Sequence, residues 1–189
     1  MLPRIRPMWL RLVKEPFDSP GYIFELKHDG FRAIAYIKVF KSLRASLASN
    51  SLAKNAILDG EIIVLDSNGV SQFNSLLPRK GENIAVFYAF DLLWLDHTDL
   101  RQLPLVERKK QLLELVQKSR CQRLLCAGHI DGIFGKQFFE AICRRDLEGI
   151  VEKRKLGIYE DNGNAWRTIK NKNYSQAEGR HELLTSRRR

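Results

Sequence analysis

Residues 25–32, ELKHDGFR, bring a lysine, two acids, a glycine and an arginine around one tight turn. The β-forming runs on either side, 22–27 and 31–39, predict a hairpin with this turn at its tip. Residues two apart share one face of a strand, so Lys27 and Asp29 are expected to face a common cleft if the strand continues through them. An uncharged lysine amine is a nucleophile, but the local sequence alone favours a surface Lys/Asp pair.

The rest of the chain reads as further strands with two helices. Runs of β-forming residues lie at 57–65, 84–95, 149–154 and 166–170. Helices are predicted at 104–117 and 137–145. Strands interleaved with few helices favour an α+β domain of mainly antiparallel sheets with flanking helices.

The first predicted helix, opened by Pro104, has a clear division of its side chains. Its apolar face consists of Leu105, Leu112 and Val116, widened by Leu113 and Leu115. The charged residues of its first turns are expected to be solvated; they are Glu107, Arg108, Lys109 and Lys110.

Composition narrows the classes of function. The 189 residues are 44% hydrophobic and 29% charged, which argues for one domain with a real core and against disorder. Charged residues interrupt every apolar run, so no membrane span is predicted. The net charge of +10 suits a polyanionic partner, and the basic excess includes an acid-free stretch at 38–54 and a tail at 187–189. Three cysteines without Cys-x-x-Cys spacing argue for a reducing, cytoplasmic location.

Three further segments hold charged residues within strand-like runs. LDGEIIVLD (58–66) places Glu61 inside an apolar run with Asp59 on the same side, and buried carboxylates need a partner. LEGIVEKR (147–154) alternates acids with apolar residues, and WRTIKNK (166–172) is a basic strand. Each segment also has a structural interpretation without chemistry. The acids would face solvent, and the lysines would keep an exposed edge strand from pairing with other chains. Phe90 is equally consistent with core packing, and Asp91 with Arg108 is consistent with a structural pair.

These segments resemble the motifs of the covalent nucleotidyltransferases when they are taken together and in order. The order is ELKHDGFR, LDGE, FYAFDLLWLD with DLRQLPLVERKK, LEGIVEKR and WRTIKNK. The match is to the adenylation domain of bacterial ATP-dependent DNA ligases and extends over about residues 24–180. The resemblance implies an ATP-grasp-like nucleotidyltransferase domain. We expect a single adenylation domain over 1–189, with an N-terminal extension at 1–20, a short basic tail at 175–189 and no oligonucleotide-binding domain.

The resemblance also implies a reaction. Lys27 would attack the α-phosphate of ATP, with Mg²⁺ or Mn²⁺ present, and hold AMP through a phosphoramide bond. The AMP would then pass to a 5′-phosphate at a nick in double-stranded DNA, and the 3′-hydroxyl would displace it during repair or recombination. The implied location is the cytoplasm, with the nucleoid during repair.

Roles follow position by position from the matched motifs. The catalytic residues would be Lys27, Asp29 and Lys170. The two carboxylates linked to the metal would be Glu61 and Glu148. ATP or AMP would be bound by Glu25, which reads the adenine amino group, Leu26, Lys27, Arg32, Glu61, which holds the ribose, Phe90, which stacks on the base, and the phosphate-contacting Lys153 and Lys170.

The chain departs from the family pattern in three places. The segment between Lys27 and Glu61 lacks a Ser-Arg-Asn-Gly motif, for which Arg44 is a candidate substitute. Thr168 stands where the fifth motif usually has its first lysine, which predicts slower adenylation. The missing oligonucleotide-binding domain leaves room for a partner protein that supplies a clamp on the duplex.

Two alternative functions stay open at this point. One is a related enzyme that acts on RNA ends, or a capping-type enzyme that uses GTP. The other is a degenerate, non-catalytic module that binds nucleotide or DNA. A P-loop enzyme is excluded, because GIFGKQ (132–137) has the wrong spacing and no Ser or Thr after its lysine.

Overall fold

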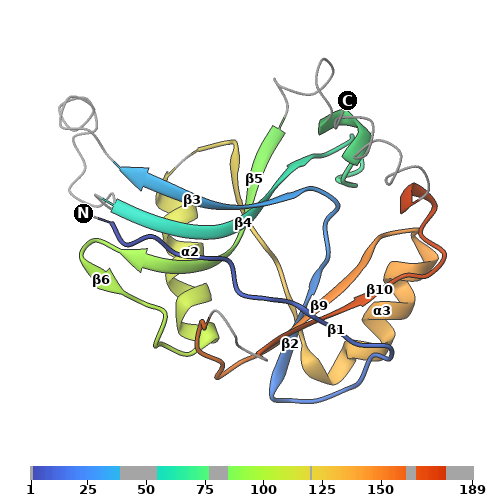
Figure 1. Ribbon diagram of the computed structural model, residues 1–189. Coiled ribbons are helices and arrows are strands. Elements are labelled where there is room, and N and C mark those ends of the chain that lie inside the picture. The colour runs from blue at the N-terminus through green and yellow to red at the C-terminus, as the bar shows by residue number, and fades with distance from the viewer. Residues whose placement is uncertain (1, 39–54, 77–84, 120, 161–164, 178–189) are drawn as a thin grey trace, which may run out of the picture.

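The computed structural model describes residues 2–38, 55–76, 85–119, 121–160 and 165–177, which fold into two five-stranded sheets with a helix against each (Figure 1). The predicted α+β class with mainly antiparallel sheets is confirmed. Most of the acid-free stretch 38–54, including Arg44, and the basic tail at 187–189 lie outside the described residues.

The first sheet carries the N-terminal and C-terminal strands. Its order is β1-β10-β9-β2-β8, antiparallel except for the parallel β1–β10 pair. The strands are β1 (Arg11–Leu12), β10 (Trp166–Lys170), β9 (Gly149–Arg154), β2 (Tyr22–Leu26) and β8 (Ile130–Asp131).

The second sheet is built from the middle of the chain. Its order is β3-β4-β5-β6, all antiparallel, and β7 adds to β5 in parallel. The strands are β3 (Phe31–Lys38), β4 (Asn55–Val64), β5 (Ala85–Leu95), β6 (Thr98–Asp99) and β7 (Leu124–Cys126). A tight turn at 66–69 follows β4, and in it the Gly69 amide donates to the Asp66 carbonyl at 3.0 Å.

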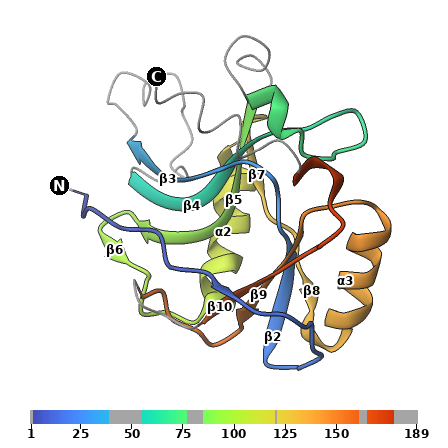
Figure 2. The same ribbon diagram turned by 45° about the vertical axis from the view of Figure 1, so that its right-hand side comes forward.

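The predicted hairpin across residues 22–39 is wrong. β2 pairs with β8 and β9, whereas β3 pairs with β4 in the other sheet. The chain therefore uses the turn at 27–30 to cross between sheets, as Figures 1 and 2 show from two sides. A local turn signal fixes a change of direction, but the choice of pairing strand depends on segments far along the chain.

Each sheet carries one helix. α2 (Leu105–Ser119) packs on β5, and α3 (Gly135–Arg144) packs on β9 and β2. Three short 3-10 helices complete the described elements: η1 (Phe73–Leu76), η2 (Gly132–Phe134) and η3 (Ser175–Ala177). The expectation that Arg108 and Lys109 of α2 are solvated is wrong, because both side chains are buried against acids of the sheets.

The N-terminal segment ties the two sheets together. Its β1 strand joins the first sheet, and the Ile5 amide donates to the Tyr36 hydroxyl on β3 of the second, at 2.9 Å. Ile5 and Met8 are buried in a core cluster with Trp166 and Leu93. The described part of the chain contains no helix that is long and apolar enough to cross a membrane.

Glu152 of β9 is a buried acid on the face of the first sheet that packs against α3. Its carboxylate is fully buried and lies 3.1 Å from Nε of Arg167. Burial raises the pKa of Glu152 from 4.5 to about 7, while Arg167 opposes that shift. The folded state therefore binds this proton more tightly than the unfolded chain does.

This linkage gives the first prediction, for Glu152→Gln. The stabilisation from protonated Glu152 is complete below pH 4.5 and is lost as the pH rises through about 7. Relative to the variant, the wild type should lose roughly 2–3 kcal/mol of unfolding free energy between pH 4.5 and 8, measured by urea denaturation. The exposed Glu160→Gln is the control. A difference between wild type and Glu152→Gln that does not change with pH would contradict this reading.

Candidate active site

A cavity lies between the two sheets and takes its walls from both. Its volume is about 460 Å³ including the open mouth, which is in the range of small-molecule sites. The lining combines charged groups with aromatic and apolar side chains: Leu10, Glu25, Leu26, Lys27, His28, Arg32, Glu61, Tyr88, Phe90, Ala127, Val151, Lys153 and Trp166. The structure thus gathers seven of the predicted nucleotide-binding residues, from five strands and the crossing segment, around one cavity.

Lys27 is the first residue of the crossing segment and is fixed by its backbone. Its amide donates to the Gly149 carbonyl at 2.9 Å, which continues the β2–β9 ladder by one bond. Its Nζ lies 2.7 Å from Oε2 of Glu148, the residue just before β9. Gly149 has φ of 152°, and a Cβ there would lie 2.1 Å from the Ile169 carbonyl oxygen, so only glycine carries the chain through this point.

A second carboxylate, Glu61 of β4, faces the same end of the cavity. Burial raises the pKa of Glu61 to about 7; Lys27 lowers it, and the nearby Glu148 raises it further. Lys27 and Glu61 therefore line this end of the cavity, and Glu148 stands behind it, paired with Lys27. In the described part of the chain there is no group of three or more metal-binding side chains, so a divalent ion here would need ligands from a bound phosphate as well.

The opposite end of the cavity is built around Glu25. Oε1 of Glu25 lies 2.5 Å from Nζ of Lys109, and Oε2 lies 2.6 Å from Nζ of Lys153. The Lys153 ammonium also lies over two aromatic rings, 4.4 Å from the Phe90 centroid and 3.9 Å from that of Trp166. Although Glu25 is buried, the two lysines hold its pKa below the usual value.

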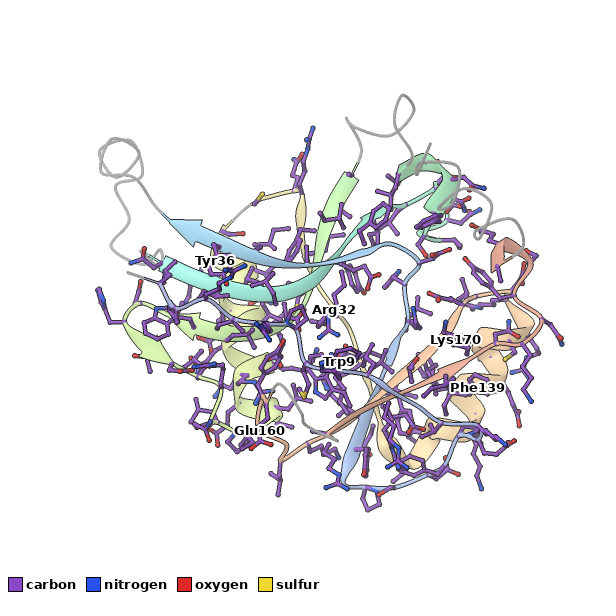
Figure 3. All side chains as sticks on the ribbon, viewed as in Figure 1. Trp9, Arg32, Tyr36, Phe139, Glu160 and Lys170 are labelled. Carbon is purple, nitrogen blue, oxygen red and sulfur yellow. The ribbon has the colours of Figure 1, made fainter. Side chains whose placement is uncertain are left out.

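Arg32 lines the cavity but is already engaged with the protein. Its Nε and Nη2 form a bidentate pair with Asp59 at 3.1 and 2.7 Å, and Nη1 donates to the Met8 carbonyl at 2.6 Å. The Tyr159 hydroxyl donates to the same carboxylate at 2.7 Å. Figure 3 shows Arg32 near the centre of the molecule, between the two sheets. This network joins the second sheet to the N-terminal segment and to the loop that follows β9.

The other two predicted catalytic residues lie outside the cavity wall. Asp29 is buried, and its carboxylate accepts a hydrogen bond from the Tyr174 hydroxyl at 3.1 Å. Lys170 is exposed at the end of β10, on the α3 side of the molecule in Figure 3. Its register partner is Gly149, whose carbonyl holds Lys27, so it stands at the lysine end of the sheet.

Sequence reasoning missed three residues of this region. His28 lines the cavity, its two ring nitrogens have no hydrogen-bond partner within the described chain, and burial lowers its pKa to about 4. Tyr88 packs edge-on to it, with centroids 4.3 Å apart. The third residue is Lys109, which helical periodicity predicts to be solvated but which contacts Glu25. The signal available for His28 was its place between Lys27 and Asp29, whereas nothing local distinguished Lys109 from its neighbour Lys110.

Two sheets that enclose a cavity lined by a lysine, two acids and aromatic rings match the nucleotidyltransferase class of domain. The comparisons with known proteins give the family. Residues 35–172 match the family model described as "ATP dependent DNA ligase domain". The chain belongs to this family, and the expectation of an ATP-dependent DNA ligase domain is confirmed.

Individual relatives agree with the family match. The chain is 31% identical to the SPbeta prophage-derived DNA ligase-like protein LigB of Bacillus subtilis, covering 92% of this chain and 69% of LigB. It is 30% identical to the multifunctional non-homologous end joining protein LigD of Mycolicibacterium smegmatis, over 86% of this chain but 23% of that protein. Among solved structures, mycobacterial DNA ligase D complexed with ATP and MES matches with a TM-score of 0.68 at 26% identity, over 87% of this chain and 59% of that one.

The Arg32–Asp59 network gives a stability prediction. Asp59→Asn leaves a largely buried guanidinium without its carboxylate, so the free energy of unfolding should fall by about 3–5 kcal/mol. The matched control is Asp99→Asn, because the Asp99–Arg101 pair is exposed; there the loss should stay within about 0.5–1 kcal/mol. Urea denaturation of both variants measures the difference. Equal losses at the two sites would show that the buried network does not stabilise the junction.

Proposed function

We propose that this domain is the catalytic core of an ATP-dependent DNA ligase that becomes adenylated on Lys27. The proposal rests on one observation: a single cavity is lined by Lys27 and Glu61 together with Glu25 and Phe90, and Glu148 pairs with the Lys27 amine. The family membership makes ATP the nucleotide. The single-domain organisation over 1–189 belongs to the same proposal.

The chemical step needs a free amine at Lys27. Its Nζ attacks the α-phosphorus, the new P–N bond forms as the P–O bond to pyrophosphate breaks, and the amine gives up a proton. In the structure Glu148 holds that Nζ at 2.7 Å, so this ion pair has to open before attack. The same pair fixes the side chain of Lys27, which lines the cavity.

A divalent ion, Mg²⁺ or Mn²⁺, fits the lysine end of the cavity. Glu61 and Glu148 would hold it together with phosphate oxygens, since Mg²⁺ is commonly bound by one or two carboxylates plus phosphates. When bound, the ion supplies charge neutralisation at the phosphates. Lys170, at the same end of the first sheet, is proposed as a further phosphate contact, and Asp29 as an acid used later with the nick.

The other end of the cavity suits the nucleoside. Phe90 offers an aromatic face for the base, Glu25 and the backbone at Leu26 border the slot, and Glu61 is proposed to hold the ribose. Arg32 is proposed to act near the ribose while it stays paired with Asp59. Lys153, paired with Glu25, belongs to this base end, and a phosphate contact would require it to leave Glu25.

The proposed acceptor is a nick in double-stranded DNA. The net charge of +10 supports binding to a polyanion, and the ligase relatives support DNA in particular. A partner protein that clamps the duplex belongs to the proposal, as do a repair role and a cytoplasmic site of action.

One labelling experiment tests the covalent step. Incubation with Mg²⁺ and α-³²P-ATP should give a labelled band that survives denaturing electrophoresis, and Lys27→Ala should abolish it. Lys118→Ala, an exposed helix position, is the control and should label like the wild type. Labelling by α-³²P-GTP instead would favour a capping-type enzyme. A folded wild type that takes no label from either nucleotide would refute the enzyme and leave a binding module.

A further prediction concerns Thr168, which lies on the cavity side of β10 between Trp166 and Lys170. Its hydroxyl donates to the Ile150 carbonyl at 3.2 Å, so the side chain adds no charge to the site. Thr168→Lys should speed adenylation by roughly 3–10-fold, since an added cation stabilises the charge that develops on the phosphates. Thr98→Lys, in exposed β6, controls for net charge. An unchanged or lower single-turnover rate in Thr168→Lys would speak against the alignment of this motif.

A further inference from the structure

The Glu25 carboxylate is clamped between two lysines that come from different parts of the fold. Lys109 reaches it from α2 at 2.5 Å, and Lys153 reaches it from β9 at 2.6 Å. All three side chains are at most 6% exposed. Burying charges is costly, so such a cluster persists only where the geometry is good and the remaining donors have acceptors. Lys109 meets this condition by donating also to the Ala127 carbonyl at 3.1 Å.

Lys109 stands behind the cavity wall. Glu25, Lys153 and Ala127 all line the cavity, whereas Lys109 does not. A nucleotide in this cavity would touch Glu25 and Lys153, and it would sense Lys109 through the two lining residues that Lys109 contacts, Glu25 and Ala127. The arrangement separates a contacting pair from a supporting residue.

The cluster carries a formal charge of +1, from two ammonium groups and one carboxylate. The lysines hold the pKa of Glu25 below its usual value, so Glu25 is an acceptor at neutral pH. Lys109 is the better-compensated cation, since Glu25 raises its pKa against the effect of burial. The Lys153 ammonium lies beside the Glu25 carboxylate and over the Phe90 and Trp166 rings, so a donor, an acceptor and two aromatic rings lie together.

We propose that Lys109 is a positioning residue for nucleotide selection, holding Glu25 so that Glu25 and Lys153 present an acceptor beside a donor to one edge of the purine. This inference rests on the proposed function. Adenine offers an amino donor beside a ring-nitrogen acceptor, which matches that pair. Guanine offers two acceptors on the corresponding edge, so its O6 would face the Glu25 carboxylate. An anchored carboxylate rejects guanine, whereas a carboxylate that can turn away does not.

The test compares Lys109→Met with Lys110→Met, an exposed neighbour on the same helix. Single-turnover labelling is measured over a range of ATP and GTP concentrations. For Lys109→Met we expect the half-saturating ATP concentration to rise about tenfold and the preference for ATP over GTP to fall about tenfold, because a mispositioned polar group weakens discrimination. The maximal rate at saturating ATP should change less than about threefold. Lys110→Met should behave as wild type.

Binding separates this inference from the proposed function. In a Lys27→Ala background, equilibrium dialysis with labelled ATP and GTP reads selectivity without any covalent step, so it remains informative if adenylation itself is not observed. Thermal melting checks the fold, and Lys109→Gln replaces the Met variant if that variant does not fold. Unchanged selectivity in the neutral variant would overturn the proposal. So would an equal weakening of ATP and GTP binding, which is the outcome of a purely structural role.

Discussion

No side chain fits at position 30, and that constraint lets the segment that crosses between the sheets lie directly against β4. A Cβ on Gly30 would lie 2.4 Å from the Ile62 carbonyl oxygen and 2.9 Å from Cγ of Glu61. The chain can thus leave β2, press against β4 and enter β3 within four residues. The Asp29 amide donates to the Ser71 hydroxyl at 3.1 Å, and this hydrogen bond also fixes the segment that crosses between the sheets. Because Lys27 opens this crossing, its place at the seam between the sheets follows from the packing of the backbone.

Buried ion pairs specify how the elements meet around that seam. Arg108 of α2 and Asp91 of β5 are both fully buried, in a bidentate pair with contacts of 2.8 Å. Lys109, the next residue on the helix, reaches past β5 to Glu25 of the other sheet. Such pairs contribute little net stability compared with apolar packing, but leaving one charge unpaired costs several kcal/mol. A helix turned or shifted by one residue would strand both cations, so the pairs select a single docking of α2.

The sequence predicted the parts of the fold that depend on local patterns. Strands at 149–154 and 166–170 are present with those bounds, and both helices lie within two residues of their expected limits. The hairpin failed because a tight turn does not reveal which strand lies beside it. The prediction for Lys109 was wrong because helical periodicity places a lysine in solvent. Its acceptor, Glu25, lies 84 positions away in the sequence. The cavity residues were predicted from the order of the family motifs. The alternation of side chains along a strand does not show which of its two faces contacts a ligand.

The groups around the two ends of the cavity have opposite formal charges, and this polarity would orient a nucleotide bound as proposed. Glu25 with its two lysines gives +1, whereas Lys27 with Glu61 and Glu148 gives −1 when both acids are ionised. A bare triphosphate would be repelled at the lysine end, so we expect it to enter with a divalent cation that joins its oxygens to the two acids. Such an ion would be held by Glu61 and Glu148 and would supply charge neutralisation at the phosphates. Because Glu148 also pairs with Lys27, its engagement there would free the Lys27 side chain for attack.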